Sequence, residues 1–130
     1  MRLVDEHGDP VSIEDRSSIT ISDQELAIGD RIKVLGFPGM GGIKITITPG
    51  EQAGWLTGEG NGWEGRFYKT SAKMGPGVSG GAAFTELGGD FIGIPTGGKE
   101  SSEGGDVLGL IRPSSYAVPL IEKAATFSDR

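Results

Sequence analysis

Short apolar runs separated by glycine and proline make up most of the chain. Apolar and polar residues alternate within these runs, as they do in half-buried β-strands, and the alternation is clearest in residues 31–36 and 43–48. Pro49 and Gly50 are expected to end the second of these strands. Further strands are predicted for residues 55–57, 66–70, 82–84, 91–94 and 107–111. Turn-bounded strands at this spacing predict an all-β barrel or sandwich.

The end of the chain has a different pattern. Pro119 suits the first turn of a helix, because the N–H group that proline lacks has no partner there. The apolar residues that follow recur at helical spacing and fall on one face, namely Leu120, Ile121, Ala124 and Ala125. We expect a short C-terminal helix that covers one end of the barrel. No linker or internal repeat interrupts the chain, so residues 1–130 are expected to form a single domain.

The composition supports a turn-rich β-domain and argues against nucleic acid and membranes as its partners. The 130 residues include 24 glycines and 7 prolines, and this much glycine disfavours a helical bundle. The net charge of −6 without a basic run argues against nucleic acid, and no apolar span is long enough for a membrane. The chain has no cysteine, and no motif implies a metal or another cofactor. The start of the chain shows no targeting segment, which leaves the compartment unknown.

Candidate chemistry lies in residues 75–84, whose sequence is Gly-Pro-Gly-Val-Ser-Gly-Gly-Ala-Ala-Phe. A nucleophilic serine needs a sharp turn that exposes its hydroxyl beside backbone N–H groups aimed at the developing oxyanion. Glycines on both sides of Ser79 permit such a turn, and Gly77 leaves its N–H group free to act with that of Ser79. The alternative is a glycine-rich hairpin with an incidental serine.

The order of the surrounding segments resembles the second β-barrel of bacterial trypsin-like serine peptidases of the HtrA type. The matching segments, in order, are residues 29–39, 45–55, 70–81, 91–94 and 113–124. The resemblance extends over residues 18–124. It implies a single antiparallel Greek-key β-barrel, the C-terminal barrel of such a peptidase, with a short helix at its end.

The resemblance assigns roles to five residues. Ser79 matches the nucleophile, and the N–H groups of Gly77 and Ser79 match the oxyanion hole. Ile94 and Thr96 lie on the strand that matches the edge pairing with substrate backbone. Lys73 precedes the serine where related enzymes have the floor of the specificity pocket, and an ammonium there would favour an acidic substrate side chain. A solvated surface lysine is the alternative for this position.

The chain also departs from the family pattern. Val78 precedes the serine where Asn or Asp is common, and Ser71 and Gly75 replace a common Asp and a common Asn. In this family the histidine and carboxylate of the triad come from the first barrel or the junction, earlier than any segment matched here. His7 is the only histidine, and its Glu-His-Gly-Asp-Pro turn matches no catalytic segment.

Three hypotheses follow. The first is a fragment of a serine endopeptidase that supplies nucleophile and oxyanion hole for hydrolysis of an extended peptide or protein. It would be inactive without the missing N-terminal barrel of its parent chain, and it leaves open an extracytoplasmic bacterial parent. The second is a non-catalytic barrel that binds peptides or proteins. The third is a complete small hydrolase in which His7 acts as the base.

Overall fold

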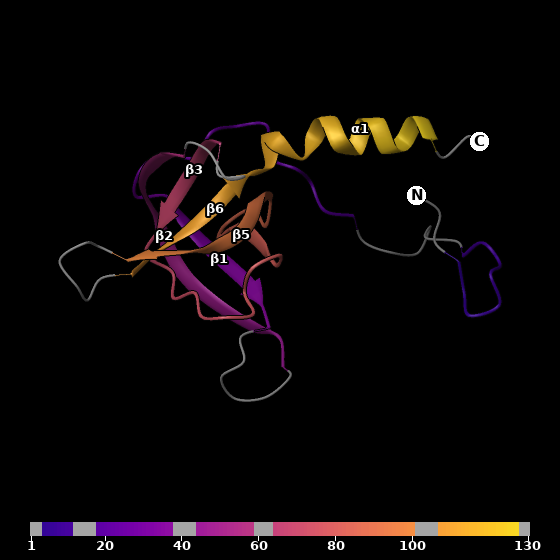
Figure 1. The fold of residues 1–130 in the computed structure, drawn as a ribbon, viewed down its shortest axis with the longest axis horizontal. Coiled ribbons are helices and arrows are strands. Elements are labelled where there is room, and N and C mark those ends of the chain that lie inside the picture. The colour runs from indigo at the N-terminus through magenta and orange to yellow at the C-terminus, as the bar shows by residue number, and fades with distance from the viewer. Residues whose placement is uncertain (1–3, 12–17, 38–43, 59–63, 101–106, 128–130) are drawn as a thin grey trace.

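Six antiparallel strands close into one barrel in the computed structural model (Figure 1), which describes residues 4–11, 18–37, 44–58, 64–100 and 107–127. The strands are β1 (Arg31–Gly36), β2 (Thr46–Gly58), β3 (Gly65–Thr70), β4 (Ala82–Thr85), β5 (Phe91–Glu100) and β6 (Val107–Pro113). Their order around the barrel is β1-β2-β3-β6-β5-β4. Because β4 returns to pair with β1 rather than with β3, the first four strands form a Greek key, and the predicted fold is confirmed.

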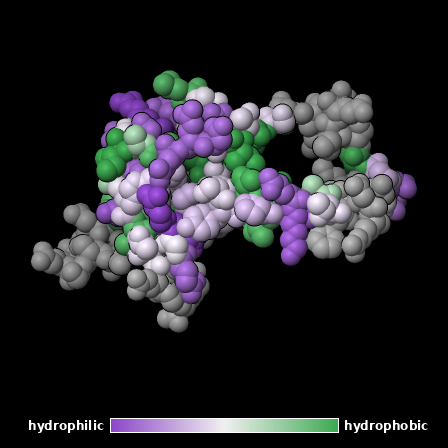
Figure 2. All heavy atoms as spheres, turned by 90° about the horizontal axis from the view of Figure 1, so that it is seen from above, coloured by the Kyte–Doolittle hydropathy of each residue, from purple (hydrophilic) through white to green (hydrophobic). Residues whose placement is uncertain are grey.

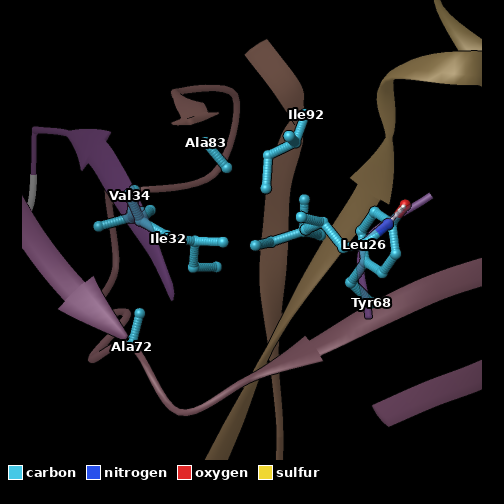
Figure 3. Packing of buried hydrophobic residues seen from close by; sticks show 9 residues of the cluster. Leu26, Ile32, Val34, Tyr68, Ala72, Ala83 and Ile92 are labelled. Atoms are coloured by element: carbon cyan, nitrogen blue, oxygen red, sulfur yellow. Dashed lines mark hydrogen bonds between the residues drawn. The ribbon is translucent and has the colours of Figure 1, made fainter. Parts of the chain in front are cut away.

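Apolar and polar residues alternate along the strands, and the apolar residues that face inward fill the barrel. Along β1, Ile32 and Val34 are buried while Arg31 and Lys33 are exposed. The core also takes in residues from outside the strands, as Figure 3 shows for Leu26 and Ala72 among the other labelled side chains. The buried apolar residues are Leu26, Ile32, Val34, Phe67, Tyr68, Ala72, Val78, Ala83, Ile92, Leu110 and Ile111. The connection between β3 and β4, which supplies Ala72 and Val78, is therefore part of the core.

Strand β2 differs from its prediction. It begins at Thr46 and continues through Pro49 and Gly50 to Gly58, so the expected end at Pro49 is wrong. Pro49 pairs with Lys33 of β1, whereas β3 joins β2 only from Gln52 onward. At Pro49 the strand therefore has a single strand neighbour, and such an edge position tolerates a residue without an N–H group.

Helix α1 (Val118–Phe127) follows a 3-10 turn, η1 (Ser114–Tyr116), with Pro119 in its first turn as predicted. The expectation that it covers the barrel is wrong. The helix projects away from the strands (Figure 1), packs mainly against η1, and exposes residues 119–126. Seen from the side of α1, apolar atoms reach the surface between the barrel and the end of the chain (Figure 2). Among the described residues, no helix is both long and apolar enough to span a bilayer.

The segment before β1 is bound to the barrel near the start of β5. Ile21 forms a parallel bridge with Phe91, and the N–H of Ser22 donates to the Phe91 carbonyl over 2.9 Å. Further along, the N–H of buried Leu26 donates to the hydroxyl of Tyr68 over 3.2 Å. Burial raises the pKa of Tyr68 above its ordinary value. Residues 4–11, by contrast, lie apart from the barrel (Figure 1).

Candidate active site: the serine elbow

Ser79 lies on the Greek-key connection that crosses one end of the barrel between β3 and β4. This connection runs from Ser71 to Gly81, and its two buried apolar residues, Ala72 and Val78, are 3% and 4% exposed. The burial of Val78 fixes the positions of its two neighbours, Gly77 and Ser79. Gly77 and Ser79 consequently face solvent while the residue between them packs into the core.

Close packing of the connection against β1 requires glycine at two positions. A Cβ atom on Gly36 would lie 2.9 Å from the Cα of Val78, and one on Gly81 would collide with the carbonyl oxygen of Leu35. No side chain fits at either place without a shift of backbone. The turn itself uses a third glycine, since Gly77 has a φ of +97°.

The backbone N–H groups of residues 77–81, which we call the elbow, divide into two sets. The N–H of Val78 donates to Gly75 O (3.2 Å), that of Gly80 to Pro95 O (2.8 Å) and that of Gly81 to Val78 O (3.0 Å). The N–H groups of Gly77 and Ser79 find no acceptor among the residues that the structure describes. The two amides predicted to form the oxyanion hole are thus the two among residues 77–81 for which the described fold provides no acceptor.

A hollow of about 340 Å³ opens beside Ser79. It is lined by Leu35, Gly36, Phe37, Gly77, Ser79, Gly80, Gly81 and Ala82. None of these residues has an acidic or basic side chain, and Ser79 supplies the only side-chain hydroxyl among them. The described lining therefore offers donors for an anion and a hydroxyl, but it contains no base that could take the proton from Ser79.

The predicted substrate-binding strand lies next to the elbow. Beyond Gly93, β5 pairs with β6 alone, so its other edge has no strand partner among the described residues. The bond from Gly80 to the Pro95 carbonyl places this edge directly beside the elbow. Ile94 is 36% exposed there, whereas the hydroxyl of Thr96 donates to the Leu110 carbonyl on β6 over 3.3 Å. An unpaired strand edge is what β-augmentation by a peptide requires.

Lys73 does not line the hollow. Its side chain is exposed, and its carbonyl accepts a hydrogen bond from the hydroxyl of Thr48 over 3.0 Å. The next residue, Met74, turns toward the barrel, where its Sδ lies 2.8 Å from the position that a Cβ on Gly109 would take. The proposed role of Lys73 in specificity stays a prediction.

His7 is in the segment that lies apart from the barrel. Its Nε2 is 3.5 Å from a carboxylate oxygen of its neighbour Glu6, and both side chains are exposed. Neither residue lines the hollow at Ser79. The structure thus does not bring His7 to the serine, which counts against the third hypothesis.

The wall formed by Leu35 and Phe37 was not among the predicted site residues. Leu35 lies on the outer face of β1, opposite buried Ile32 and Val34, and only the folded barrel shows that this face borders the elbow. The only available signal was the Gly-Phe-Pro-Gly sequence after β1, whose Gly36 has to accommodate Val78.

A closed Greek-key barrel with a serine on its crossover connection, beside two amides without a described acceptor, is consistent with one barrel of a trypsin-like peptidase domain. The chain belongs to the family described as trypsin-like peptidase domain, whose sequence model matches residues 10–94.

Solved structures show the same fold. The HtrA-type protease AlgW with a tripeptide is 25% identical, with a TM-score of 0.67 over 87% of this chain. A variant of AlgW with a decapeptide is 23% identical, with a TM-score of 0.69 over 90% of this chain. The matches cover 37% and 35% of those protease chains, so this chain spans little more than a third of their length. No sequence among the curated proteins matches.

Proposed function

We propose that the chain, as a single domain, is the C-terminal barrel of a serine endopeptidase and carries its nucleophile. Ser79 Oγ attacks the carbonyl carbon of a peptide bond, and the N–H groups of Gly77 and Ser79 donate to the oxyanion that forms. The amine then leaves and water hydrolyses the acyl-enzyme. The observation that carries this proposal is the pair of N–H groups without a described acceptor on either side of buried Val78.

The proton of Ser79 needs a base, and the described residues supply none at the hollow. We propose that a histidine and an aspartate from an N-terminal barrel of the parent chain complete the triad. The exposed apolar face of α1, with Leu120 68% and Ile121 49% exposed, supports a missing partner of this kind. The isolated chain is then inert toward peptides.

The substrate of the complete enzyme is an extended peptide or protein. Two observations support this choice. The open edge of β5 beside the elbow can pair with substrate backbone. In addition, the structures of AlgW and its variant contain bound peptides. Neither metal nor organic cofactor is needed for acyl transfer of this kind.

A barrel that binds peptides without cleaving them is the second candidate. It is favoured by the absence of a titratable side chain at the described hollow. A pseudopeptidase would keep the open edge of β5 and lose only the chemistry. The two candidates therefore differ in one property, the reactivity of Ser79 once the rest of the parent chain is present.

A fluorophosphonate probe separates the candidates. It should be applied to this chain and to the full-length product of its reading frame, and labelled peptides should be mapped by mass spectrometry. We expect labelling of the full-length protein at Ser79, abolished by Ser79→Ala, and no labelling of the isolated chain. Ser115→Ala is the control and should leave labelling intact, because Ser115 is exposed and is not among the described residues that line the hollow.

An inert full-length protein would contradict the endopeptidase and support the peptide-binding barrel. Labelling of the isolated chain at Ser79 would contradict the need for a second barrel, and its loss in His7→Ala would revive the complete small hydrolase.

A further inference from the structure

A second cavity lies at the other end of the barrel from the elbow. Its volume is about 580 Å³, and we call it the larger cavity because the hollow at Ser79 measures about 340 Å³. It includes Arg66, near the start of β3, whereas the connection that carries Ser79 leaves β3 after its last residue, Thr70. The two share no described lining residue, so the larger cavity is a separate site.

Rings and apolar side chains form much of the lining of the larger cavity. The rings of Trp55 and Tyr68 lie with their centroids 4.4 Å apart, and the turn into α1 supplies further apolar residues. Trp55 and Val118 are half-buried, while Tyr116 and Pro119 are exposed, so these residues present surface to a ligand. A concave apolar lining with a few polar groups is typical of a binding site.

One cation of the protein itself already lies in this cavity. The guanidinium carbon of Arg66 is 3.7 Å from the ring centroid of Trp55, and its Nη1 is 3.0 Å from Oε1 of Glu25. A ring face and a carboxylate together favour a guanidinium or an ammonium group. Arg66 therefore shows which chemistry the larger cavity accommodates.

The surface around Arg66 has an excess of negative charge. Asp23 and Glu25 line the larger cavity and also an adjoining hollow of about 430 Å³. Asp30 and Asp90 line this adjoining hollow too, and its described lining contains no basic residue. Four carboxylates therefore accompany a single guanidinium, and this balance favours a basic ligand.

The main chain beside the larger cavity has free hydrogen-bonding groups. In the segment before β1, neither the N–H groups nor the carbonyls of Asp23 and Glu25 have a hydrogen-bond partner among the residues that the structure describes. Such groups are complementary to the backbone of another peptide. The site therefore combines free backbone groups, an apolar lining and negative charge.

We propose that the larger cavity binds a segment of a partner protein in which apolar side chains lie next to a lysine or an arginine. The apolar side chains pack against the lining, the basic side chain pairs with Asp23, and the backbone bonds to the segment before β1. This inference goes beyond the proposed function, because none of these contacts involves Ser79.

Peptide titrations test the inference. The probe is Gly-Arg-Leu-Leu-Arg-Gly with blocked ends, which places a basic residue next to apolar ones in either chain direction. Gly-Glu-Leu-Leu-Glu-Gly lacks the basic residues, and Gly-Arg-Ser-Ser-Arg-Gly lacks the apolar ones. Calorimetry gives the dissociation constant for the isolated chain and for the full-length protein, and NMR of the 15N-labelled chain locates the peptide.

We expect the probe to bind roughly tenfold more tightly than either of the other two peptides. Its signals should locate it at the larger cavity, through shifts of the backbone amides of Asp23 and Glu25 and of the indole N–H of Trp55. The amides of Gly77 and Ser79, which line the other hollow, should keep their positions.

Variants of the lining sharpen the test. Asp23→Lys should weaken binding of the probe roughly tenfold, whereas Glu122→Lys, the same charge change at an exposed residue of α1 outside both hollows, should not. Val118→Ser should also weaken binding. Its control is Leu120→Ser, because Leu120 is 68% exposed on the same helix and does not line the cavity. Circular dichroism should show that all four variants keep the fold.

Equal affinity for the three peptides would overturn the inference, as would shifts confined to β5 and the elbow. Binding to the isolated chain that is lost in the full-length protein would also overturn it, because another part of the parent chain would then cover the cavity. These outcomes do not depend on the reactivity of Ser79. Failure of the inference is therefore distinguishable from failure of the proposed function, which the phosphonate experiment detects.

Discussion

The two ends of the barrel both contain cavities, and the larger one is not at the serine. A cavity of about 580 Å³ lies between the segment before β1, the strands β2 and β3, and the start of α1. Its walls include Trp55, Arg66 and Tyr68, and the hollow at Ser79 is smaller, at about 340 Å³. The two sites differ in whether their polar groups have hydrogen-bond or ion-pair partners within the protein.

At the larger cavity several polar groups already have partners. Arg66 contacts Glu25 at 3.0 Å and lies 3.7 Å above the ring of Trp55. The hydroxyls of Tyr68 and Tyr116 accept backbone N–H groups, at 3.2 Å and 2.9 Å. At the elbow, two N–H groups and one hydroxyl have no partner among the described residues. Donors left without acceptors, rather than volume, therefore mark the candidate active site.

The largest expected effect is at the elbow. Gly81→Ala places a Cβ against the Leu35 carbonyl, so the connection has to move away from β1. We expect a loss of about 3 kcal/mol in the free energy of unfolding, measured by urea denaturation. Gly89→Ala is the control: its φ is +65° but nothing lies within 4 Å, so about 1 kcal/mol is expected. Equal losses would show that the close packing at Gly81 is unimportant.

Tyr68→Phe should be the costliest polar change at the other end. It removes the acceptor for the N–H of buried Leu26, and an unpaired buried donor costs about 1–2 kcal/mol. Tyr116→Phe removes the acceptor of Arg66 N–H, but Tyr116 is 44% exposed and water can replace it. Urea denaturation of both variants should therefore rank Tyr68→Phe as the less stable, and the reverse order would contradict the described contacts.

Alkaline pH should act through the same tyrosine. Burial raises the pKa of Tyr68 in the folded protein, so the unfolded chain loses this proton first. The free energy of unfolding should fall as the pH rises past about 10, the ordinary tyrosine pKa, until the folded state also ionises. Tyr68→Phe should make this decrease with pH shallower. If the decrease is unchanged in the variant, other ionisable groups cause it. Chemical denaturation at several pH values between 8 and 11 measures it.

Smaller effects are expected from the ion pair at the larger cavity. The side chains of Glu25 and Arg66 are 59% and 51% exposed, so solvent screens their attraction. Glu25→Gln should change the free energy of unfolding by about 0.5 kcal/mol or less. A loss of several times this amount in urea would mean that the carboxylate supports the packing of Arg66 on Trp55.

The smallest effect on stability should come from Ser79→Ala. Its hydroxyl is exposed and has no hydrogen-bond partner among the described residues, so the midpoint of thermal unfolding should stay the same. The value of this variant lies in the contrast with Gly81→Ala two residues later. A marked loss of stability would indicate that Ser79 has a structural role.

The elements that the sequence predicted well are those governed by local chemistry. Strand β1 follows from its alternation, the start of α1 from Pro119, and the elbow from the glycines around Ser79. The remaining features depend on contacts between residues far apart in the sequence. Whether Pro49 ends β2 depends on where β3 begins to pair, and no local pattern records that.

The same limit applies to the site. Leu35 was not predicted as a site residue, because only the closure of the barrel brings the outer face of β1 to the elbow. The helical pattern after Pro119 correctly gave an apolar face, but it could not indicate that α1 packs mainly against η1 rather than over the barrel. Lys73 was chosen by its spacing from Ser79, and spacing does not show which way a side chain turns.

Hydrogen exchange of the 15N-labelled chain tests whether the amides of Gly77 and Ser79 are available to bind an oxyanion. We expect these two amides to exchange at nearly the rate of an unfolded peptide, while that of Gly80, bonded to the Pro95 carbonyl at 2.8 Å, is protected. Protection of Gly77 and Ser79 equal to that of Gly80 would rule out the proposed oxyanion hole, because the two donors would then already be bound within the fold.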